Sequence, residues 1–94
     1  MDSTEALELL DRELATFREE AHAELAQRIA GGSLAYERSG PSGTTYQIEI
    51  QFLWDARPGG DIRVMASIDD GGWRAVVPLT RSFIKRPDGS FAGE

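Results

Sequence analysis

The chain has 94 residues, of which 40% are hydrophobic and 28% charged, and its formal net charge at pH 7 is −6. This length and composition predict one globular domain over residues 1–94 with a small core. The acidic balance argues against nucleic acid as a partner, because neutralising phosphates requires a basic face. The absence of cysteine excludes disulfides and thiolate chemistry.

The sequence contains no apolar run of transmembrane length and no stretch that resembles a signal peptide. We therefore expect a soluble, cytoplasmic protein that does not bind membranes. Arginine outnumbers lysine nine to one, a bias that is typical of GC-rich genomes and favours a bacterial source.

Residues 4–30 contain neither glycine nor proline and predict one long amphipathic helix. Asp2 or Ser3 is expected as its N-cap, Glu5 can complete a capping box, and Gly31-Gly32 supplies the stop. The apolar stripe follows three- and four-residue spacing and consists of Leu7, Leu10, Leu14, Phe17, Ala21, Leu25 and Ile29.

Four segments after the helix predict an antiparallel meander sheet in chain order. Residues 44–55, 61–69 and 73–79 alternate apolar and polar side chains, which is the period of a half-buried strand. The shorter segment 33–38 is expected at an edge of the sheet.

The turns between these segments predict how the strands pair. Closing the first loop places Tyr36 opposite Tyr46, and closing the second places Trp54 opposite Ile62. A two-residue type I′ turn at Asp70-Gly71 places Ile68 opposite Trp73.

These elements predict an α+β fold in which one long N-terminal helix covers the apolar face of a four-stranded antiparallel meander. The arrangement resembles the cystatin-like fold, which also underlies the larger NTF2-like folds. The cystatin inhibitory loop has no match here, because Gln47-Ile48-Glu49-Ile50-Gln51 lies inside a strand and lacks the glycine. Residues 81–94 are expected to form a flexible or folded-back tail, with Pro87-Asp88-Gly89 as a turn.

The face of the sheet that the helix does not cover is expected to carry an apolar patch, which often marks a partner or self-association surface. The alternative is that the tail covers this patch. The candidate interface residues are Leu53, Met65, Val76 and Pro78.

A polar row is predicted on the same face, with Glu49 opposite Ser67 and Ser67 opposite Arg74. Such a row can bind a ligand, or it can simply pair charges on the surface, where an exposed pair contributes little to stability.

Two other chemistries stay open. A pocket at one end of helix and sheet, lined by Tyr36, Tyr46, Trp54 or Trp73, would bind a small molecule. His22, the only histidine, would serve a small enzyme as acid or base together with a neighbouring carboxylate.

The sequence shows no metal-binding or catalytic signature above background, and no cofactor is expected. The leading prediction is a non-enzymatic interaction module that forms a homodimer, or binds another protein, through the outer sheet face. A small-ligand-binding domain is the second hypothesis and the His22 enzyme the third.

Overall fold

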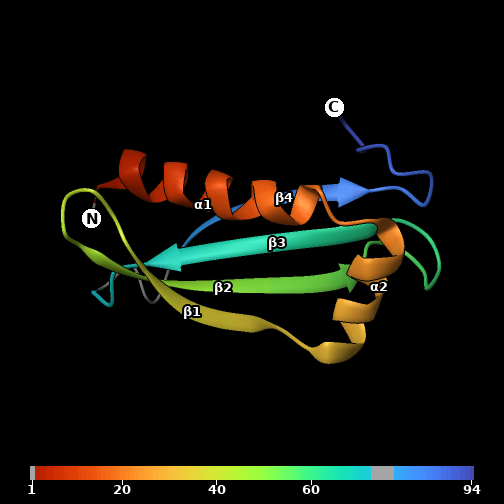
Figure 1. Ribbon diagram of the computed structural model, residues 1–94, viewed down its shortest axis with the longest axis horizontal. Helices are drawn as coiled ribbons and strands as arrows, with labels where there is room; N and C mark the ends of the chain where they lie inside the picture. The colour runs from red at the N-terminus through yellow and green to blue at the C-terminus, as the bar shows by residue number, and fades with distance from the viewer. Residues whose placement is uncertain (1, 73–77) are drawn as a thin grey trace.

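The computed structural model describes residues 2–72 and 78–94. Two helices precede four strands, which form one antiparallel sheet in the order β1-β2-β3-β4, and both helices pack on the same face of it (Figure 1). The predicted α+β fold and meander order are confirmed. The elements are α1 (Ser3–Arg18), α2 (His22–Gly31), β1 (Leu34–Ser39), β2 (Thr45–Trp54), β3 (Ile62–Asp69) and β4 (Leu79–Lys85).

The prediction of a single helix over residues 4–30 is wrong, because α1 ends at Arg18 and α2 begins at His22. The last carbonyls of a helix have no N–H partners within it. Here Lys85 Nζ donates hydrogen bonds to the main-chain oxygens of Arg18 at 2.8 Å and Glu20 at 2.6 Å. Lys85 of the last strand therefore helps to stabilise the bend.

Two contacts close to the bend also stabilise it. The guanidinium of Arg28 donates to both carboxylate oxygens of Glu20, at 2.7 and 2.8 Å. The N–H of Ala21 donates to the Glu24 carboxylate at 3.1 Å, which caps the start of α2. Ala21 is exposed at this position, although the sequence places it in the apolar stripe. The other stripe residues are buried or partly buried in the core.

The predicted start and stop of the helical segment are confirmed. The Asp2 carboxylate accepts a hydrogen bond from the Glu5 N–H at 3.1 Å, and Gly32 ends α2 with a φ of +88°. The Glu5 carboxylate itself accepts from the Tyr46 hydroxyl at 2.8 Å and the Ser42 hydroxyl at 2.7 Å. These bonds tie the first turn of α1 to β2 and to the turn that precedes it.

The centre of the sheet pairs as predicted, with Trp54 opposite Ile62. The β1–β2 register is wrong by two residues, since Tyr36 lies opposite Ile48 instead of Tyr46. The turn is tighter than expected, because the Gly43 N–H donates to the Gly40 carbonyl at 2.9 Å. The left-handed φ of Gly43, +89°, suits such a turn.

The predicted β3–β4 register is also wrong. Ile68 lies opposite Leu79, where the sequence predicts Trp73, and Ile62 lies opposite Lys85. β4 therefore begins six residues later than predicted. Residues 73–77, which include Trp73, Arg74 and Val76, lie outside the described residues, and so do the predictions that concern them.

The cause of this shift is visible in the turn after β3. A type I′ turn needs a positive φ at both central residues, and Asp70 does not adopt one. Instead, the carboxylates of Asp69 and Asp70 accept hydrogen bonds from the N–H groups of Gly71 at 2.8 Å and Gly72 at 3.0 Å. Such side-chain turns compete with a tight hairpin.

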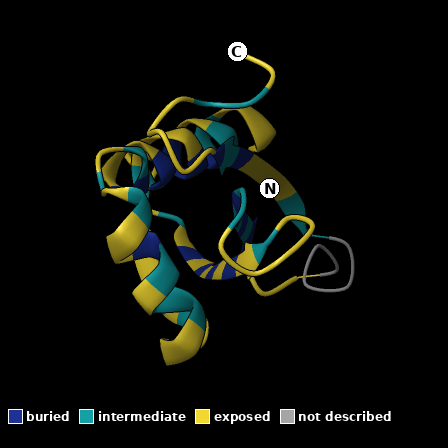
Figure 2. Cartoon of the chain, turned by 90° about the vertical axis from the view of Figure 1, so that its right-hand side faces the viewer, coloured by how far each residue is buried: buried dark blue, intermediate teal, exposed yellow. Residues whose placement is uncertain are grey.

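The core lies between the helices and the inner face of the sheet. Seen from the end of the molecule, the buried stretches of α1 and the sheet, in dark blue, surround this interior (Figure 2). Burial of large apolar side chains stabilises the fold by about 1.5–3 kcal/mol each before entropy is subtracted. The largest fully buried side chains are Tyr46, Leu10, Leu25, Ile48, Ile50, Ile62, Ile68 and Val64.

The segment predicted as a tail, residues 81–94, contains most of β4 and a turn. β4 places Phe83 in the core. The chain then turns back, with the Gly89 N–H donating to the Arg86 carbonyl at 2.9 Å and Phe91 bridging to Lys85. The Phe91 ring lies 5.7 Å from that of Phe83, edge to face. The turn thus packs against the helix side of the sheet.

Candidate interaction surface

The sheet face opposite the helices, here called the outer face, carries three neighbouring apolar side chains. Leu53 lies opposite Arg63, Arg63 lies opposite Ile84, and Met65 is the next outward residue along β3. Diagonal neighbours on one face of a sheet are within reach of long side chains. We call Leu53, Met65 and Ile84 the apolar patch.

The described part of the chain buries the apolar patch only partly. Among the described residues, Leu53 is the one large hydrophobic residue that is exposed, at 37%, while Met65 and Ile84 are partly buried. The turn after β4 does not cover the patch, because its Phe91 packs on the opposite side of the sheet, against Phe83. Burial on one face only is the pattern expected of a sheet that has a partner or water on its other side.

Two residues of the predicted interface, Leu53 and Met65, therefore lie together in the apolar patch. Pro78 is partly buried just before β4, and Val76 lies outside the described residues. Ile84 also belongs to the apolar patch, although the sequence predicts it in the tail. Thr80, Ser82 and Ile84 are alternate residues of β4, so a strand that starts at Leu79 places Ile84 on the outer face.

Arg63 crosses the outer face in the middle of the apolar patch. Its Nε and Nη2 contact Asp55 Oδ1 at 3.0 and 2.9 Å, and its Nη1 donates to Ser82 Oγ at 3.3 Å. A guanidinium carries five N–H donors, so these contacts leave donors for a further acceptor. The side chain is 33% exposed.

The other end of the outer face is hollowed and acidic. A hollow of about 360 Å³ spreads over β1, β2 and β3, and the described residues that line it include no basic side chain. We call it the acidic hollow, after its carboxylates Glu37, Glu49 and Asp69. The Glu37 carboxylate accepts a hydrogen bond from the Gln47 amide at 3.0 Å, and the Glu49 carboxylate accepts one from the Gln51 amide at 3.2 Å.

The predicted polar row runs along the edge of this hollow. Glu49 lies opposite Ser67, as the sequence predicts. The β4 partner of Ser67 is Thr80, where the sequence predicts Arg74. Arg74 lies outside the described residues.

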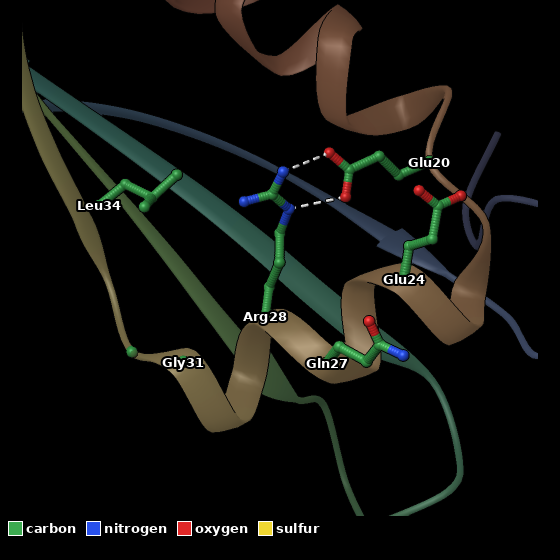
Figure 3. A pocket seen from close by; sticks show the side chains of 7 residues that line it. Glu20, Glu24, Gln27, Arg28, Gly31 and Leu34 are labelled. Atoms are coloured by element: carbon green, nitrogen blue, oxygen red, sulfur yellow. Dashed lines mark hydrogen bonds and ion pairs between the residues drawn. The ribbon is translucent and has the colours of Figure 1, made fainter.

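A trough between the helices and β1 is the second concave feature. It comprises two hollows of about 340 and 310 Å³ that share Glu20, Arg28 and Leu34. Figure 3 shows Arg28 reaching from α2 across the trough to Glu20, and this ion pair raises the pKa of Arg28. The Arg28 guanidinium also lies over the ring of Phe17, at 5.2 Å.

The rest of the trough is similarly self-paired. Arg38 contacts the Glu13 carboxylate at 3.3 Å and lies 4.5 Å above the Tyr36 ring. Burial, together with a hydrogen bond to Glu13, raises the pKa of the Tyr36 phenol. In this part of the trough, Glu13 thus already binds both Arg38 and Tyr36.

The residues of the predicted pocket lie in different places. Tyr36 lines the trough. Tyr46 is fully buried, and this burial, together with its hydrogen bond to Glu5, raises the pKa of its phenol to about 12. Trp54 lies at the opposite end of β2 from Tyr46, and Trp73 is outside the described residues. The three described side chains do not share a cavity.

His22 takes part in packing α2 against the sheet. Its Nε2 lies 2.7 Å from the carbonyl oxygen of Gly60, and its ring centroid lies 6.1 Å from that of Trp54. A carbonyl oxygen can only accept, so Nε2 carries a proton and donates it. This contact joins the first turn of α2 to the β2–β3 loop and offers no free base at Nε2.

Within residues 2–72 and 78–94, no cluster of histidine and carboxylate side chains is placed to hold a metal ion. In the same part of the chain, neither α1 nor α2 has the length and apolar character that crossing a membrane requires.

Comparison of this chain with protein-family models, with curated proteins and with solved structures finds no match.

Proposed function

We propose that the chain is a non-enzymatic interaction module that associates with a second copy of itself through the outer face. The observation that carries this proposal is the position of the apolar patch. Both helices and the turn after β4 pack on the inner side, so Leu53, Met65 and Ile84 share a face that no described segment covers. Clustered apolar side chains beside polar ones are typical of protein-binding surfaces.

The size of the outer face sets the expected strength of the contact. Four strands of up to ten residues span roughly 30 by 15 Å, or about 450 Å² of projected surface per copy. This is at the lower end of specific protein interfaces. The proposed dimer is therefore weak and forms at high protein concentration.

Sedimentation velocity over a range of concentrations tests the proposal. The wild-type chain should shift from monomer to dimer as concentration rises, and Met65→Glu should remain monomeric because it buries a charge in the contact. Ala23→Glu adds the same charge at an exposed position of α2 and should dimerise normally. A wild-type chain that stays monomeric at every concentration would refute self-association.

A small-ligand-binding function in the trough is the second candidate. Its support is size, because hollows of about 340 and 310 Å³ fall within the range of small-molecule sites. A metabolite that binds there should shift the amide resonances of Gln27, Gly31 and Leu34, and should do so equally in Met65→Glu. Shifts confined to other residues would rule out the trough.

The proposal also includes a cystatin-like arrangement, a bacterial source and a cytoplasmic location. The cystatin-like arrangement is supported by the order of helix and meander, with α1 and α2 in place of one helix. The acidic, arginine-rich composition supports a bacterial, cytoplasmic protein.

A further inference from the structure

The β1 strand has one edge that faces away from β2. The Gly40 N–H donates to the Thr44 carbonyl at 2.9 Å, and this pair continues the β1–β2 register. Main-chain hydrogen bonds to an antiparallel neighbour alternate along a strand, so the even-numbered residues of β1 bond to β2. The odd-numbered residues direct their N–H and carbonyl groups away from β2, and all of them are exposed: Ala35, Glu37 and Ser39. We call these main-chain groups the open edge.

The two edges of the sheet differ in what occupies them. At β4, the Ala92 N–H donates to the Ile84 carbonyl at 3.0 Å, so the chain's own last residues pair with that edge. Among the described residues, the open edge has one partner, the Arg38 guanidinium, which donates to the Glu37 carbonyl at 3.1 Å. The Arg38 side chain is 53% exposed and can be displaced by a main-chain donor. An unpaired strand edge is a template for another extended chain.

The trough provides room on the helix side of the open edge. Its hollow of about 310 Å³ is bordered by Leu34 and Tyr36 from β1 and by Phe17 from α1. Successive side chains of a strand point to opposite faces of the sheet, so a strand added beside β1 directs every second side chain toward this hollow. Leu34 and Tyr36 are partly buried, which suits an apolar side chain next to them.

The other side of the open edge is acidic. A side chain of the added strand that lies opposite Glu37 is about 5 Å from it. One that lies opposite Ala35 is two strand spacings, about 10 Å, from Glu49, which pairs with Ala35 in the register. The small Ala35 side chain leaves this path open to a long lysine or arginine. Both carboxylates line the acidic hollow, whose described lining includes no basic side chain, so basic outward side chains are favoured.

Charge also disfavours a second copy of β1 as the added strand. A copied β1 would bring its own Glu37 to the outer face beside the acidic hollow, where like charges destabilise strand pairing. Each chain also carries a formal net charge of −6, which adds repulsion between copies. The open edge is therefore better matched by a basic partner than by the chain itself.

We propose that the open edge of β1 binds an extended peptide of a partner protein in which basic and apolar side chains alternate. The peptide main chain continues the sheet, its basic side chains pair with Glu37 and Glu49, and its apolar side chains enter the trough. In this mode main-chain hydrogen bonds supply affinity and alternate side chains supply specificity. The inference does not rest on the proposed self-association, because β1 contributes no residue to the apolar patch.

A peptide of about eight residues in which lysine and valine alternate is a suitable probe. Amide hydrogen exchange followed by NMR should show the N–H groups of Ala35, Glu37 and Ser39 slowed about tenfold or more in the complex. Those of Tyr36 and Arg38 already bond to β2 and should change little. A peptide that alternates glutamate and valine should bind at least tenfold more weakly, and equal binding of the two peptides would overturn the proposal.

Methylation of the peptide main chain tests whether the peptide adds as a strand. N-methyl groups on alternate residues remove the donors from one edge of the peptide and leave the other edge intact. Methylation of the alternate set that faces β1 should abolish binding, and methylation of the other set should not. If both methylated peptides bind, or if neither does, strand addition is overturned.

Glu37→Lys tests the charge pairing from the side of the protein. It places a positive charge beside the basic side chains of the peptide and should weaken binding at least tenfold. Glu8→Lys makes the same charge change at an exposed position of α1 and should bind like wild type. Circular dichroism on both variants ensures that weak binding is not a loss of fold. Equal affinity of the two variants would overturn the pairing with Glu37.

The outcomes separate this proposal from the self-association. Met65→Glu, which should block the dimer, should bind the peptide no more weakly than wild type. A wild-type chain that stays monomeric refutes the self-association alone and leaves the open edge unaffected. Slowed exchange at Ala35 and Glu37 that appears without peptide, as protein concentration rises, would assign the open edge to a second copy and overturn the proposal.

Discussion

Lys85 Nζ, at the end of the last strand, donates a hydrogen bond at 2.6 Å to the main-chain oxygen of Glu20, which lies 65 residues earlier in the chain. The lysine side chain is only 7% exposed, yet its ammonium group has partners in the bend between α1 and α2. A positive charge at the end of α1 also interacts favourably with the helix dipole. This contact joins the last strand, β4, to the bend between α1 and α2.

Lys85→Met should therefore lower the free energy of unfolding by about 2–4 kcal/mol, because it leaves buried carbonyl oxygens without donors. Arg86→Met changes the exposed neighbouring residue and should alter stability by no more than about 0.5 kcal/mol. Urea denaturation followed by circular dichroism measures both. Equal stability of the two variants would show that the bend does not depend on Lys85.

The Glu5 network should make stability depend on pH in the acid range. Hydrogen bonds from Ser42 and then Tyr46 hold the pKa of the Glu5 carboxyl below its ordinary value of 4.5. A lowered pKa means that the contribution to stability is complete above pH 4.5 and disappears as pH falls through the native pKa. The stability difference between wild type and Glu5→Gln should accordingly shrink on acidification.

Gly40→Ala provides an independent check on this network. A Cβ at position 40 would collide with the Glu5 carboxylate, which must then move away from Ser42 and Tyr46. Thermal unfolding between pH 3 and 7 should show Gly40→Ala with the flatter acid dependence of Glu5→Gln. A wild-type acid dependence in both variants would contradict the role given to Glu5.

Both tyrosines should ionise at unusually high pH. The chain contains two, and burial, with a carboxylate partner in each case, raises the pKa of Tyr36 and brings that of Tyr46 to about 12. A raised pKa means that this contribution to stability is present below pH 10 and is lost as pH rises through the native values. Phenolate absorbance of the folded chain should therefore appear above pH 10, and that of the urea-unfolded chain near pH 10. Coincident titration curves would contradict the burial of both rings.

The two faces of the sheet should respond oppositely to charge. Ile50→Asp and Phe17→Asp place a carboxylate in the core and should abolish cooperative unfolding, because an unpaired buried charge is very costly. Gln51→Asp makes a similar change on the outer face and should keep a normal thermal transition. Loss of the transition in all three variants would refute the assignment of the faces.

The register of β4 can be tested with truncations. Phe83→Ala should cost about 3–5 kcal/mol, because Phe83 is 3% exposed in the core. Thr80→Ala, at an outward and exposed position of the same strand, should change stability by less than about 0.5 kcal/mol. Chemical denaturation of the two variants distinguishes this register from one in which residue 83 lies in a tail.

Local signals were sufficient for the centre of the fold. The alternation in β2 and β3 and the loop between them lie within one continuous segment, Thr45 to Asp69, and they predict the pairing of Trp54 with Ile62 correctly. Alternation also places Leu53 and Met65 on the outer face, since successive side chains of a strand point to opposite faces.

The two register errors come from the geometry of local turns, whereas the bend is missed because its deciding contact joins distant parts of the chain. No local breaker marks the bend after Arg18, whose hydrogen-bond donor is Lys85. In β4 the inward positions include Arg81 and Lys85, which hides the strand from an apolar pattern. Arg81 has the register of the inner face, but its side chain stays half exposed and contacts Asp11 of α1 at 3.6 Å. Because the apolar pattern does not reveal β4, the sequence does not place Ile84 in the apolar patch.

The hydrogen bonds from Lys85 to the end of α1 also bear on how the polypeptide acquires its shape during synthesis. The amino-terminal helices emerge from the ribosome first, but the donor that stabilises the bend between them becomes available only after Lys85 has left the exit tunnel. Long-range contacts of this kind slow folding and expose apolar surface in the interval. We expect nascent chains stalled before Lys85 to remain protease-sensitive and to depend on chaperones.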